Sequence, residues 1–449
     1  MSTNLSALRQ EFLRIGRYCW PALLLIAVLA VLVSRQGIRF KTIGHEQRLD
    51  GTYQISLQAN TMLDTTHKPD IIVTPQVGVE AVLLGNRITI VSKTPLQPDV
   101  DYQITVTNAR SRQGQTQSKP WQTSLRTAPA IAYGLRRTGN TDTIQMITLK
   151  DGKLQRSDIA NNTQITDFAI SADYIWYAST ATDRSQTLHF VDKRSRQDQM
   201  IPLPAAVSVE TLSAAKELNQ AIVTITSTQP EADGSLAYEN NTFIANADTT
   251  TLTPLPAPLD TAAVALYAPN GSLYLVQSRD GSVFAQTTPA DEPVPLGRTR
   301  LAGPFSRSGA TVLLRNLAAA TILTMADSSQ RPLDLLPSTA SQVQLDFTGQ
   351  RAMYSITEFD AASSGRTSLY VLEPGAEQPH LLYQLADNTY SGLISAEASF
   401  QAFAVEALPK GGQFDGYLHN AKAQGTQTLI IDGTGKLIEA IDVIDVQWQ

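Results

Sequence analysis

Residues 131–449 repeat one local pattern, a polar turn followed directly by a strand of β-branched and aromatic residues. Successive turns are separated by 42, 55, 38, 40 and 49 residues. A unit of about 40–50 residues with four short strands is typical of a β-propeller blade. The six turns are centred on Tyr174, Lys216, Gly271, Gly309, Gly349 and Ala398.

A hairpin-like segment at residues 142–158, "DTIQMITLKDGKLQRSD", precedes these turns. Its Asp-Gly pair supplies the positive φ angles that tight hairpins need. Counting this segment, we expect about seven blades in residues 131–449. A row of sandwich domains with recurring hairpins is the alternative. The near-regular period and the lack of linkers favour the propeller.

The turn in residues 303–314, "GPFSRSGATVLL", combines Phe and Ser with a Gly just before the strand. This turn and its counterparts resemble the repeats of TolB-like and related bacterial propellers. The resemblance extends over most of residues 131–449 and implies the same fold there.

A second β-rich region lies between residues 51 and 127. Its short segments alternate apolar and polar residues and are separated by turn residues, a rhythm typical of a β-sandwich. The predicted strands cover residues 52–59, 70–75, 79–85, 87–92, 101–108 and 121–127.

The order of features in this region resembles the S-layer-type bacterial Ig-like domain. In that family a proline-rich corner ending in Tyr is followed by a strand, a polar turn and a closing aromatic strand. The turn here reads "SRQGQ", whereas the family more usually has Asp or Asn before the glycine. The resemblance implies a spacer on an exported or surface protein. The corner residues are Pro95, Leu96, Pro98 and Tyr102, and residues 121–127 form the closing strand.

Residues 18–34, "YCWPALLLIAVLAVLVS", form an uncharged apolar run between Arg17 and Arg35. As a helix this run spans about 25 Å, near the lower limit for crossing a bilayer. A buried core helix seldom lacks polar residues for this length, and small cleavage-site residues of a signal peptide do not follow the run. The sequence therefore predicts a transmembrane anchor that contacts the lipid bilayer.

The anchor divides the chain into a short tail and a large body. We expect residues 1–17 to be cytoplasmic, either as an amphipathic helix on the membrane or as an extension of the membrane helix. Residues 35–50 are expected to be a stalk. The arginines and lysine flanking the run are nearly balanced, so the exported-type modules decide the orientation. They place the body outside the cytoplasm of a single-pass membrane protein.

The charge is unevenly distributed, with a net +5 over residues 1–48 and a net −11 over residues 49–449. Nucleic-acid binding requires clustered Lys and Arg, so the acidic body disfavours nucleic acid as a partner. Cys19 is the single cysteine. Intramolecular disulfides and multi-cysteine metal sites are therefore excluded.

No local motif for catalysis or for cofactor binding occurs in the sequence. None of the five histidines has a partner at zinc-site spacing, and no nucleophile elbow is present. The segment 431–437, "IDGTGKL", lacks the first glycine and the Ser or Thr of a phosphate loop. We therefore expect no cofactor, no metal and no enzyme activity, although a site assembled from scattered loops would leave no such motif.

Two loops are longer than a blade requires, at residues 227–241 and 406–420. Long loops often carry functional contacts, and exposed aromatic side chains often anchor partners. Tyr238, Phe414 and Tyr417 are therefore the candidate partner-binding residues. The alternative is that these aromatics only pack against their own loops.

These features together favour a membrane-tethered, extracytoplasmic binding or assembly protein of the scaffold or adhesion type. In this hypothesis an Ig-like spacer, residues 51–127, presents the propeller to another protein or to an envelope polymer. The alternative is a propeller enzyme, a hydrolase or lyase, that acts on cell-envelope glycans.

Overall fold

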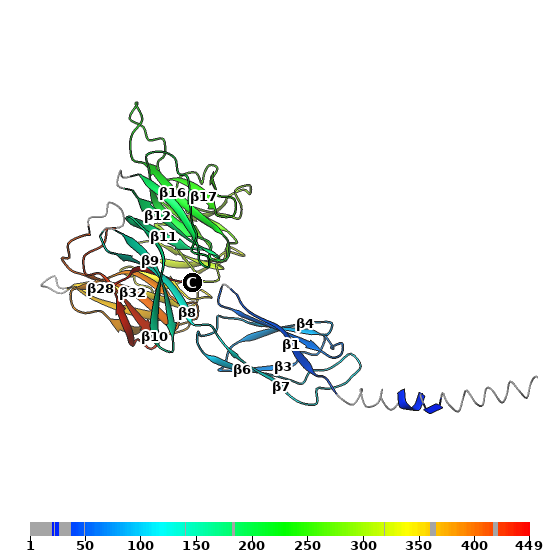
Figure 1. Cartoon of the computed structure of the whole chain (residues 1–449). Coiled ribbons are helices and arrows are strands. Elements are labelled where there is room, and N and C mark those ends of the chain that lie inside the picture. The colour runs from blue at the N-terminus through cyan, green and yellow to red at the C-terminus, as the bar shows by residue number, and fades with distance from the viewer. Residues whose placement is uncertain are drawn as a thin grey trace, which may run out of the picture. The chain divides into compact units, whose positions relative to one another are not determined.

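The computed structural model describes residues 20–21, 23–26, 37–48, 50–139, 141–181, 185–317, 319–359, 365–415 and 421–449. These residues form two compact units, one built from most of residues 37–126 and the other mainly from residues 127–449. Nearly all of their regular structure is β-strand (Figure 1). The prediction of an all-β chain is therefore confirmed.

The first unit consists of two antiparallel sheets, with strand orders β1–β2–β5–β4 and β3–β6–β7. Buried and more exposed residues alternate along β2, β5 and β6, so each strand turns one face inward. Leu57, Ile88 and Val106 are fully buried on these inner faces. The strands are β1 (Phe40–Gln47), β2 (Tyr53–Ala59), β3 (Asp70–Thr74), β4 (Val79–Leu84), β5 (Arg87–Ser92), β6 (Asp101–Thr107) and β7 (Trp121–Arg126).

Strand β1 was not predicted, because it lies in the segment 35–50 that was expected to be a stalk. Seven of its eight residues are exposed, so no apolar alternation marks it as a strand. Backbone pairing with β2 holds it in the sheet instead. The other six strands lie where they were expected, and the ring of Tyr102 is buried. The Ig-like assignment itself stays a prediction.

The second unit contains seven four-stranded sheets, which we call blades 1 to 7. Blades 2 to 7 are each formed by four consecutive antiparallel strands. Blade 2 comprises β11 (Ile165–Ile170), β12 (Tyr174–Thr180), β13 (Gln186–Asp192) and β14 (Asp198–Ile201); blade 3, β15 (Val207–Ala214), β16 (Gln220–Ser227), β17 (Asn241–Asn246) and β18 (Thr251–Pro254); blade 4, β19 (Val264–Tyr267), β20 (Tyr274–Gln277), β21 (Ser282–Gln286) and β22 (Val294–Arg298). Blade 5 comprises β23 (Leu301–Phe305), β24 (Thr311–Arg315), β25 (Ala320–Thr324) and β26 (Gln330–Pro332); blade 6, β27 (Ser341–Leu345), β28 (Ala352–Phe359), β29 (Gly365–Leu372) and β30 (His380–Gln384); blade 7, β31 (Thr389–Ala396), β32 (Ala402–Pro409), β33 (Gln427–Asp432) and β34 (Leu437–Ile441).

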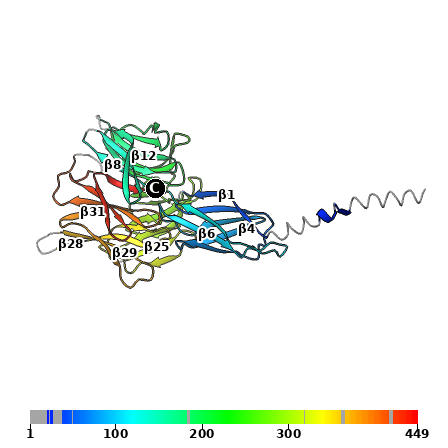
Figure 2. The ribbon, with the colours of Figure 1, turned by 60° about the horizontal axis from the view of Figure 1, so that its bottom comes forward.

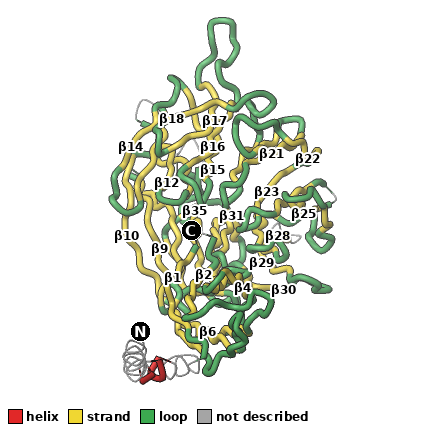
Figure 3. Tube along the Cα trace, turned by 90° about the vertical axis from the view of Figure 1, so that its right-hand side faces the viewer, coloured by secondary structure: helices red, strands yellow, loops and turns green. Residues whose placement is uncertain are grey.

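The blades are arranged around a common axis. The first strands of neighbouring blades contact one another, as β11 does with β15, and as β27 does with β31. Figure 3 shows β15, β31 and β35 around the C-terminus, with β14, β18 and β22 farther out, and Figure 2 gives a second view of the blades. This radial arrangement of four-stranded sheets is a β-propeller. The predicted propeller of about seven blades is confirmed.

Blade 1 is assembled from both ends of the second unit. It contains β8 (Ala130–Arg137), β9 (Asp142–Lys150) and β10 (Lys153–Asn162), with β35 (Ile444–Trp448) as its innermost strand. β35 is antiparallel to β8, with Gln447 opposite Tyr133 and Trp448 opposite Ala132. The C-terminal strand therefore closes the ring by pairing with the first strand of the unit.

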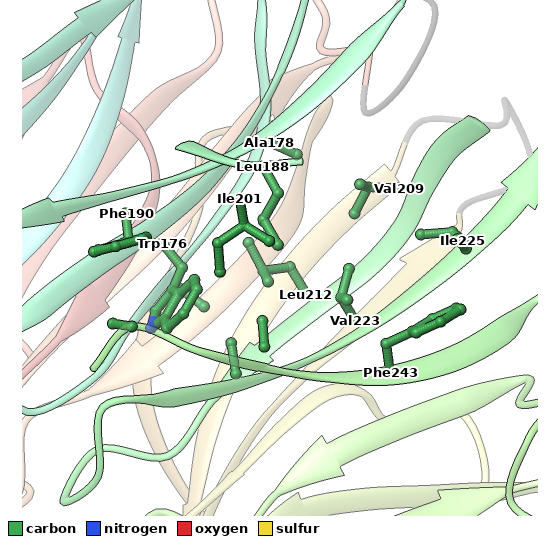
Figure 4. Packing of buried hydrophobic residues seen from close by; sticks show 14 of the residues in the cluster. Trp176, Ala178, Leu188, Phe190, Ile201, Val209, Leu212, Val223, Ile225 and Phe243 are labelled. Carbon is green, nitrogen blue, oxygen red and sulfur yellow. The ribbon is translucent and has the colours of Figure 1, made fainter. Parts of the chain in front are cut away.

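Apolar side chains fill the spaces between adjacent blades. Between blades 2 and 3, Trp176 and Leu188 pack in one cluster with Val209, Val223 and Phe243 (Figure 4). Burying side chains of this size stabilises a fold by about 1.5–3 kcal/mol each. The blades are therefore held together by their faces, while hydrogen bonds hold the strands within each blade.

The repeated turn predicted from the sequence lies in the same place in blades 2 to 7. Five of the six turn positions lie in the connection between the first and second strands of their blades, and the sixth, Tyr174, is the first residue of β12. Gly271, Gly309 and Gly349 have φ angles of +68°, +73° and +72°. Glycine adopts this left-handed conformation without the steric cost that a side chain adds. The sequence period therefore reflects a real structural repeat.

The predicted membrane anchor, residues 18–34, lies mostly outside the described residues, and the predicted tail, residues 1–17, lies wholly outside them. Of the anchor, residues 20–21 and 23–26 are described, and they are helical. In the part of the chain that the structure describes, no helix has the length and apolar character needed to cross a bilayer.

Closure of the ring can be tested by shortening one side chain of β35. Trp448 is 1% exposed and packs between blades 1 and 7. We expect Trp448→Ala to destabilise the second unit by about 3–5 kcal/mol, because the substitution leaves a large cavity. Urea denaturation monitored by circular dichroism measures this loss. Leu437→Ala, at a 39% exposed position in blade 7, is the control and should cost much less. Equal effects of the two substitutions would contradict the closure argument.

Candidate functional site

A pocket of about 270 Å³ lies at one end of the propeller axis, and we call it the axial pocket. Its walls come from β19, β23, β27, β31 and β35 and from the turns between the first and second strands of blades 3 to 7. Propeller blades converge at this position, so one pocket collects side chains from many blades. The residues that matter below are Lys216, Arg307, Asp346, Glu397 and Trp448.

Arg307 belongs to the turn between β23 and β24 and has more donors than partners. Its Nη1 donates a hydrogen bond to the backbone oxygen of Trp448 at 3.2 Å. Its Nη2 is buried and has no hydrogen-bond partner among the residues that the structure describes. Burial lowers the pKa of Arg307 to about 10, an effect that the charge of Glu397 opposes. The guanidinium is therefore charged at neutral pH and has an unused donor.

Lys216 approaches the same backbone oxygen from blade 3. Its Nζ donates to the oxygen of Trp448 at 2.5 Å. An ammonium group has three donors, and a single carbonyl satisfies one of them well. Two cations thus share one neutral acceptor at the pocket wall, so the pocket favours a ligand that brings further acceptors.

The two carboxylates that line the pocket are engaged by their own turns. Asp346 accepts backbone hydrogen bonds from Gln350 at 2.9 Å and from Arg351 at 3.2 Å. Glu397 accepts from the backbone and the hydroxyl of Ser399 at 2.9 and 2.5 Å. Burial raises the pKa of Glu397. Neither carboxylate lies within ion-pair distance of the two cations in the described residues.

The remaining wall of the pocket is apolar. Leu266, Phe305, Leu345 and Phe400 contribute to it. Ligand pockets commonly combine such walls with a few polar groups that orient the ligand. The axial pocket therefore suits a small amphipathic group with an acceptor at one end.

A buried ion cluster joins blades 7 and 1. Lys422 Nζ lies 3.1 Å from Glu406 Oε2 and 2.8 Å from Asp445 Oδ1. Glu406 also accepts hydrogen bonds from the backbone of Asp445 and Leu393, at 2.9 and 3.1 Å. A Cβ at Gly392 would lie 2.1 Å from Glu406 Oε2, so glycine leaves room for the carboxylate. Burial opposes the charge of Lys422, but Asp445 and Glu406 raise its pKa overall.

Asp167 on β11 belongs to the same electrostatic environment. Its Oδ1 accepts a hydrogen bond from the backbone of Phe168 at 2.8 Å. Burial and, to a smaller extent, the negative charge of Asp445 raise the pKa of Asp167 to about 7, although hydrogen bonds from the backbone and the charge of Lys422 oppose the shift. Near neutral pH this carboxyl group is therefore partly protonated.

A chain of hydrogen bonds crosses blade 2. His189 Nε2 lies 2.9 Å from Thr187 Oγ1, and His189 Nδ1 lies 3.4 Å from Asp198 Oδ1. The Tyr177 hydroxyl donates to Asp198, and its ring stacks on His189. Hydroxyl, imidazole and carboxylate in series also occur in nucleophilic catalysis. These residues do not line the axial pocket, so we assign them to holding β12, β13 and β14 together. Sequence spacing could not reveal the chain, because strand register brings its members together.

The three candidate partner-binding residues have different surroundings. Tyr238 is half-buried, with its ring 6.2 Å from that of Phe243, in the loop that projects beyond β16 and β17 (Figure 1). Phe414 is 68% exposed. Tyr417 lies outside the described residues. Phe243 belongs to β17 and not to the loop itself, so partner binding by the three residues and the alternative that they only pack against their own loops both stay predictions.

Sequence reasoning missed the axial pocket as a site. Lys216 was one of the six aligned turn positions, but nothing in the sequence marks a turn lysine as a binding residue. In the described residues, no group of three or more His, Cys, Asp or Glu side chains is placed to hold a metal ion.

No protein-family model matches the chain, and no curated protein matches it in sequence. Among solved structures, TolB from Acinetobacter baumannii covers 79% of this chain and 81% of its own, with 12% identity and a TM-score of 0.41. The nidogen/laminin complex covers 56% and 91%, with 11% identity and a TM-score of 0.37. Hydrazine synthase of Kuenenia stuttgartiensis covers 55% and 76%, with 10% identity and a TM-score of 0.38. At these scores the likeness adds no argument, and the propeller assignment follows from the strand order alone.

Removing the cation of the buried cluster should be costly. We expect Lys422→Met to destabilise the second unit by about 3–5 kcal/mol, because Glu406 and Asp445 remain buried without their partner. Chemical denaturation at pH 7 measures the loss. The control is Arg298→Met at an exposed pair with Asp280, where the loss should be below about 1 kcal/mol. A Lys422→Met protein as stable as the control variant would contradict this interpretation.

The raised pKa of Asp167 predicts a pH-dependent stability. The unfolded chain loses this proton near pH 4, whereas the folded protein holds it until about pH 7, so stability is lost as the pH rises between these values. Asp167→Asn removes the titration. The free energy of unfolding of the variant, relative to that of the wild type, should therefore be higher at pH 8 than at pH 4 by about 1–3 kcal/mol. Denaturation curves across this range measure the difference, and parallel profiles of the two proteins would contradict the prediction.

Proposed function

We propose that this chain is a non-catalytic binding or assembly protein whose propeller takes a partner's acceptor group into the axial pocket. The observation that carries the proposal is the buried Nη2 of Arg307, which has no hydrogen-bond partner in the described residues. A buried donor without a partner costs about 1–3 kcal/mol. A ligand that supplies the acceptor recovers this cost on binding.

A carboxylate suits this position best. Hydrogen bonds between a guanidinium or ammonium donor and a carboxylate are about twice as strong as neutral ones. A carboxylate placed between Arg307 and Lys216 accepts from both, while Phe305 and Leu266 contact the apolar part of the same ligand. A pocket of about 270 Å³ holds one or two side chains of a partner rather than a folded element.

The proposal includes an extracytoplasmic location at the cell membrane. Residues 18–34 would anchor the chain in the bilayer with the N-terminus in the cytoplasm. Residues 51–127 would act as an Ig-like spacer, in line with the resemblance of their sequence to S-layer-type modules. The partner would then be an envelope protein or an envelope polymer, and the exposed ring of Phe414 would add to the contact.

One observation favours the enzyme alternative. Asp346 and Glu397 both line the axial pocket, and burial raises the pKa of Glu397. Glycan hydrolysis uses two carboxyl groups, one of them with a raised pKa. However, each carboxylate here is engaged by its own turn, so we rank this function second.

Cross-linking in intact cells tests the proposal. Cells producing the full chain are treated with a cross-linker that does not pass the cytoplasmic membrane, and the adducts are recovered on the chain. We expect adducts from intact cells, and a loss of most of them in Arg307→Gln and Lys216→Gln. Two loop variants, Tyr238→Ala and Phe414→Ala/Tyr417→Ala, measure the contribution of the loops.

The control is Arg366→Gln, which removes a charge at a 59% exposed position. Adducts that form only after lysis would contradict the extracytoplasmic location. Adducts that are unchanged in well-folded Arg307→Gln and Lys216→Gln would contradict the role of the axial pocket. Turnover of an envelope glycan that is lost in Glu397→Gln would establish the enzyme instead.

A further inference from the structure

A second pocket, of about 250 Å³, lies in blade 5 beside the segment that links it to blade 6. We call it the arginine pocket. Its lining residues include two arginines, and none of the described residues that line it is acidic. This pocket carries two positive charges in a body whose net charge is −11. The residues used below are Arg300, Leu301, Arg315, Asn316, Leu336 and Ser338.

Strand register builds the floor of the arginine pocket. Arg315, the last residue of β24, lies between Leu301 on β23 and Ala320 on β25. The backbone of Arg300 donates to the oxygen of Arg315 at 3.1 Å and to Asn316 Oδ1 at 2.9 Å. These contacts hold the backbone of Arg300 beside the end of β24, so the blade determines the positions of both arginines.

The linker of residues 333–340 builds the wall. Leu336 and Ala340 are buried in the core between blades 5 and 6. The backbone of Leu333 donates to the oxygen of Ala320 at 2.9 Å, which ties the linker to the blade. Arg315 Nη1 donates to the oxygen of Ala340 at 2.9 Å. The guanidinium of Arg315 is thereby held between blade and linker.

Within the described part of the chain, Arg315 nevertheless lacks an anionic partner. Its Nε is buried and forms no hydrogen bond with any described residue. Burial lowers its pKa, and no described carboxylate counteracts this effect. The guanidinium of Arg300 has no hydrogen-bond or ion-pair partner among the described residues. A half-buried arginine is normally paired with an acid or an anion, and neither is supplied by the described part of the chain.

The surroundings of the two arginines are apolar. Leu301 and Leu335 are each 38% exposed, and Leu317, next to Asn316 in sequence, is 74% exposed. Leu336 and Pro337 line the pocket itself. An inorganic ion would leave these side chains in contact with water, whereas a ligand with an apolar part would cover them.

We propose that the arginine pocket binds an oxyanion, a carboxylate or a phosphate, carried by a molecule with an apolar part. The guanidinium of Arg315 donates from the floor of the pocket, and that of Arg300 donates from its exposed side. The hydroxyl of Ser338 and the amide of Asn316 supply further donors. Leu301 and Leu336 contact the apolar part. This site is independent of the axial pocket and of the function proposed for it.

Ligand-observed NMR on the purified full-length chain tests the proposal, with benzoate and phenyl phosphate as probes and benzyl alcohol as the neutral analogue. We expect at least one of the two anions to bind, and the alcohol to bind more weakly. Both anions are tested on the chain that carries Arg307→Gln, which removes the donor proposed to hold a carboxylate in the axial pocket. In that protein, binding of benzoate alone identifies carboxylates as the ligand chemistry of the arginine pocket, and binding of phenyl phosphate alone identifies phosphates. Arg315→Gln and Arg300→Gln should each weaken binding by about tenfold.

Arg298→Gln is the matched control, because Arg298 is two residues from Arg300 and pairs with Asp280 at an exposed site. Binding to this variant should be unchanged. Arg300 is exposed, so Arg300→Gln should fold normally. If Arg315→Gln does not fold, Arg300→Gln alone tests whether anion binding depends on the arginine pocket. Binding of neither anion, or equal binding of benzyl alcohol, would overturn the proposal. So would anion binding that Arg300→Gln leaves unchanged.

Discussion

The pairing of β35 with β8 is the constraint on which the second unit depends. It joins segments more than 300 residues apart in sequence and supplies the innermost strand of blade 1. The approach is close: a Cβ at Gly134 would lie 2.3 Å from Val443 Cγ1, so the absence of a side chain permits the contact. A propeller left open would expose the facing surfaces of two blades to water.

This closure also shapes the axial pocket. The backbone oxygen of Trp448, at the end of β35, accepts hydrogen bonds from Lys216 of blade 3 and from Arg307 of blade 5. Side chains from widely separated blades are therefore oriented by the last strand of the ring. The same strand carries Asp445, a member of the buried ion cluster with Lys422. The strand β35 thus contributes both to the axial pocket and to the buried ion cluster.

The buried cations of the second unit differ in how many of their donors have a partner, and the functional interpretation rests on this difference. Lys422 is surrounded by two carboxylates, so its cluster serves stability. Arg307 and Arg315 each have one buried nitrogen without a hydrogen-bond partner among the described residues. Evolved structures seldom leave such donors unpaired. Two arginines that each line a pocket and keep an unused donor therefore favour the hypothesis of ligand binding over that of catalysis, which requires acids or nucleophiles aimed at a substrate.

The sequence by itself determined the all-β class, the blade period and the position of the first turn in blades 2 to 7, because turn chemistry and strand alternation depend on neighbouring residues. It could not reveal β1, whose residues are nearly all exposed, or the position of the C-terminal strand β35 in blade 1. From the sequence, aromatic loop residues such as Tyr238 were the candidates for partner binding. The two pockets are instead lined by Lys216 and Arg307 in one case and by Arg315 in the other. Tertiary structure alone decided these features. Ring closure brings Lys216 to Trp448 from 232 positions away in the sequence, whereas pairing with β2 decides β1 and the register of blade 5 with its linker decides the arginine pocket.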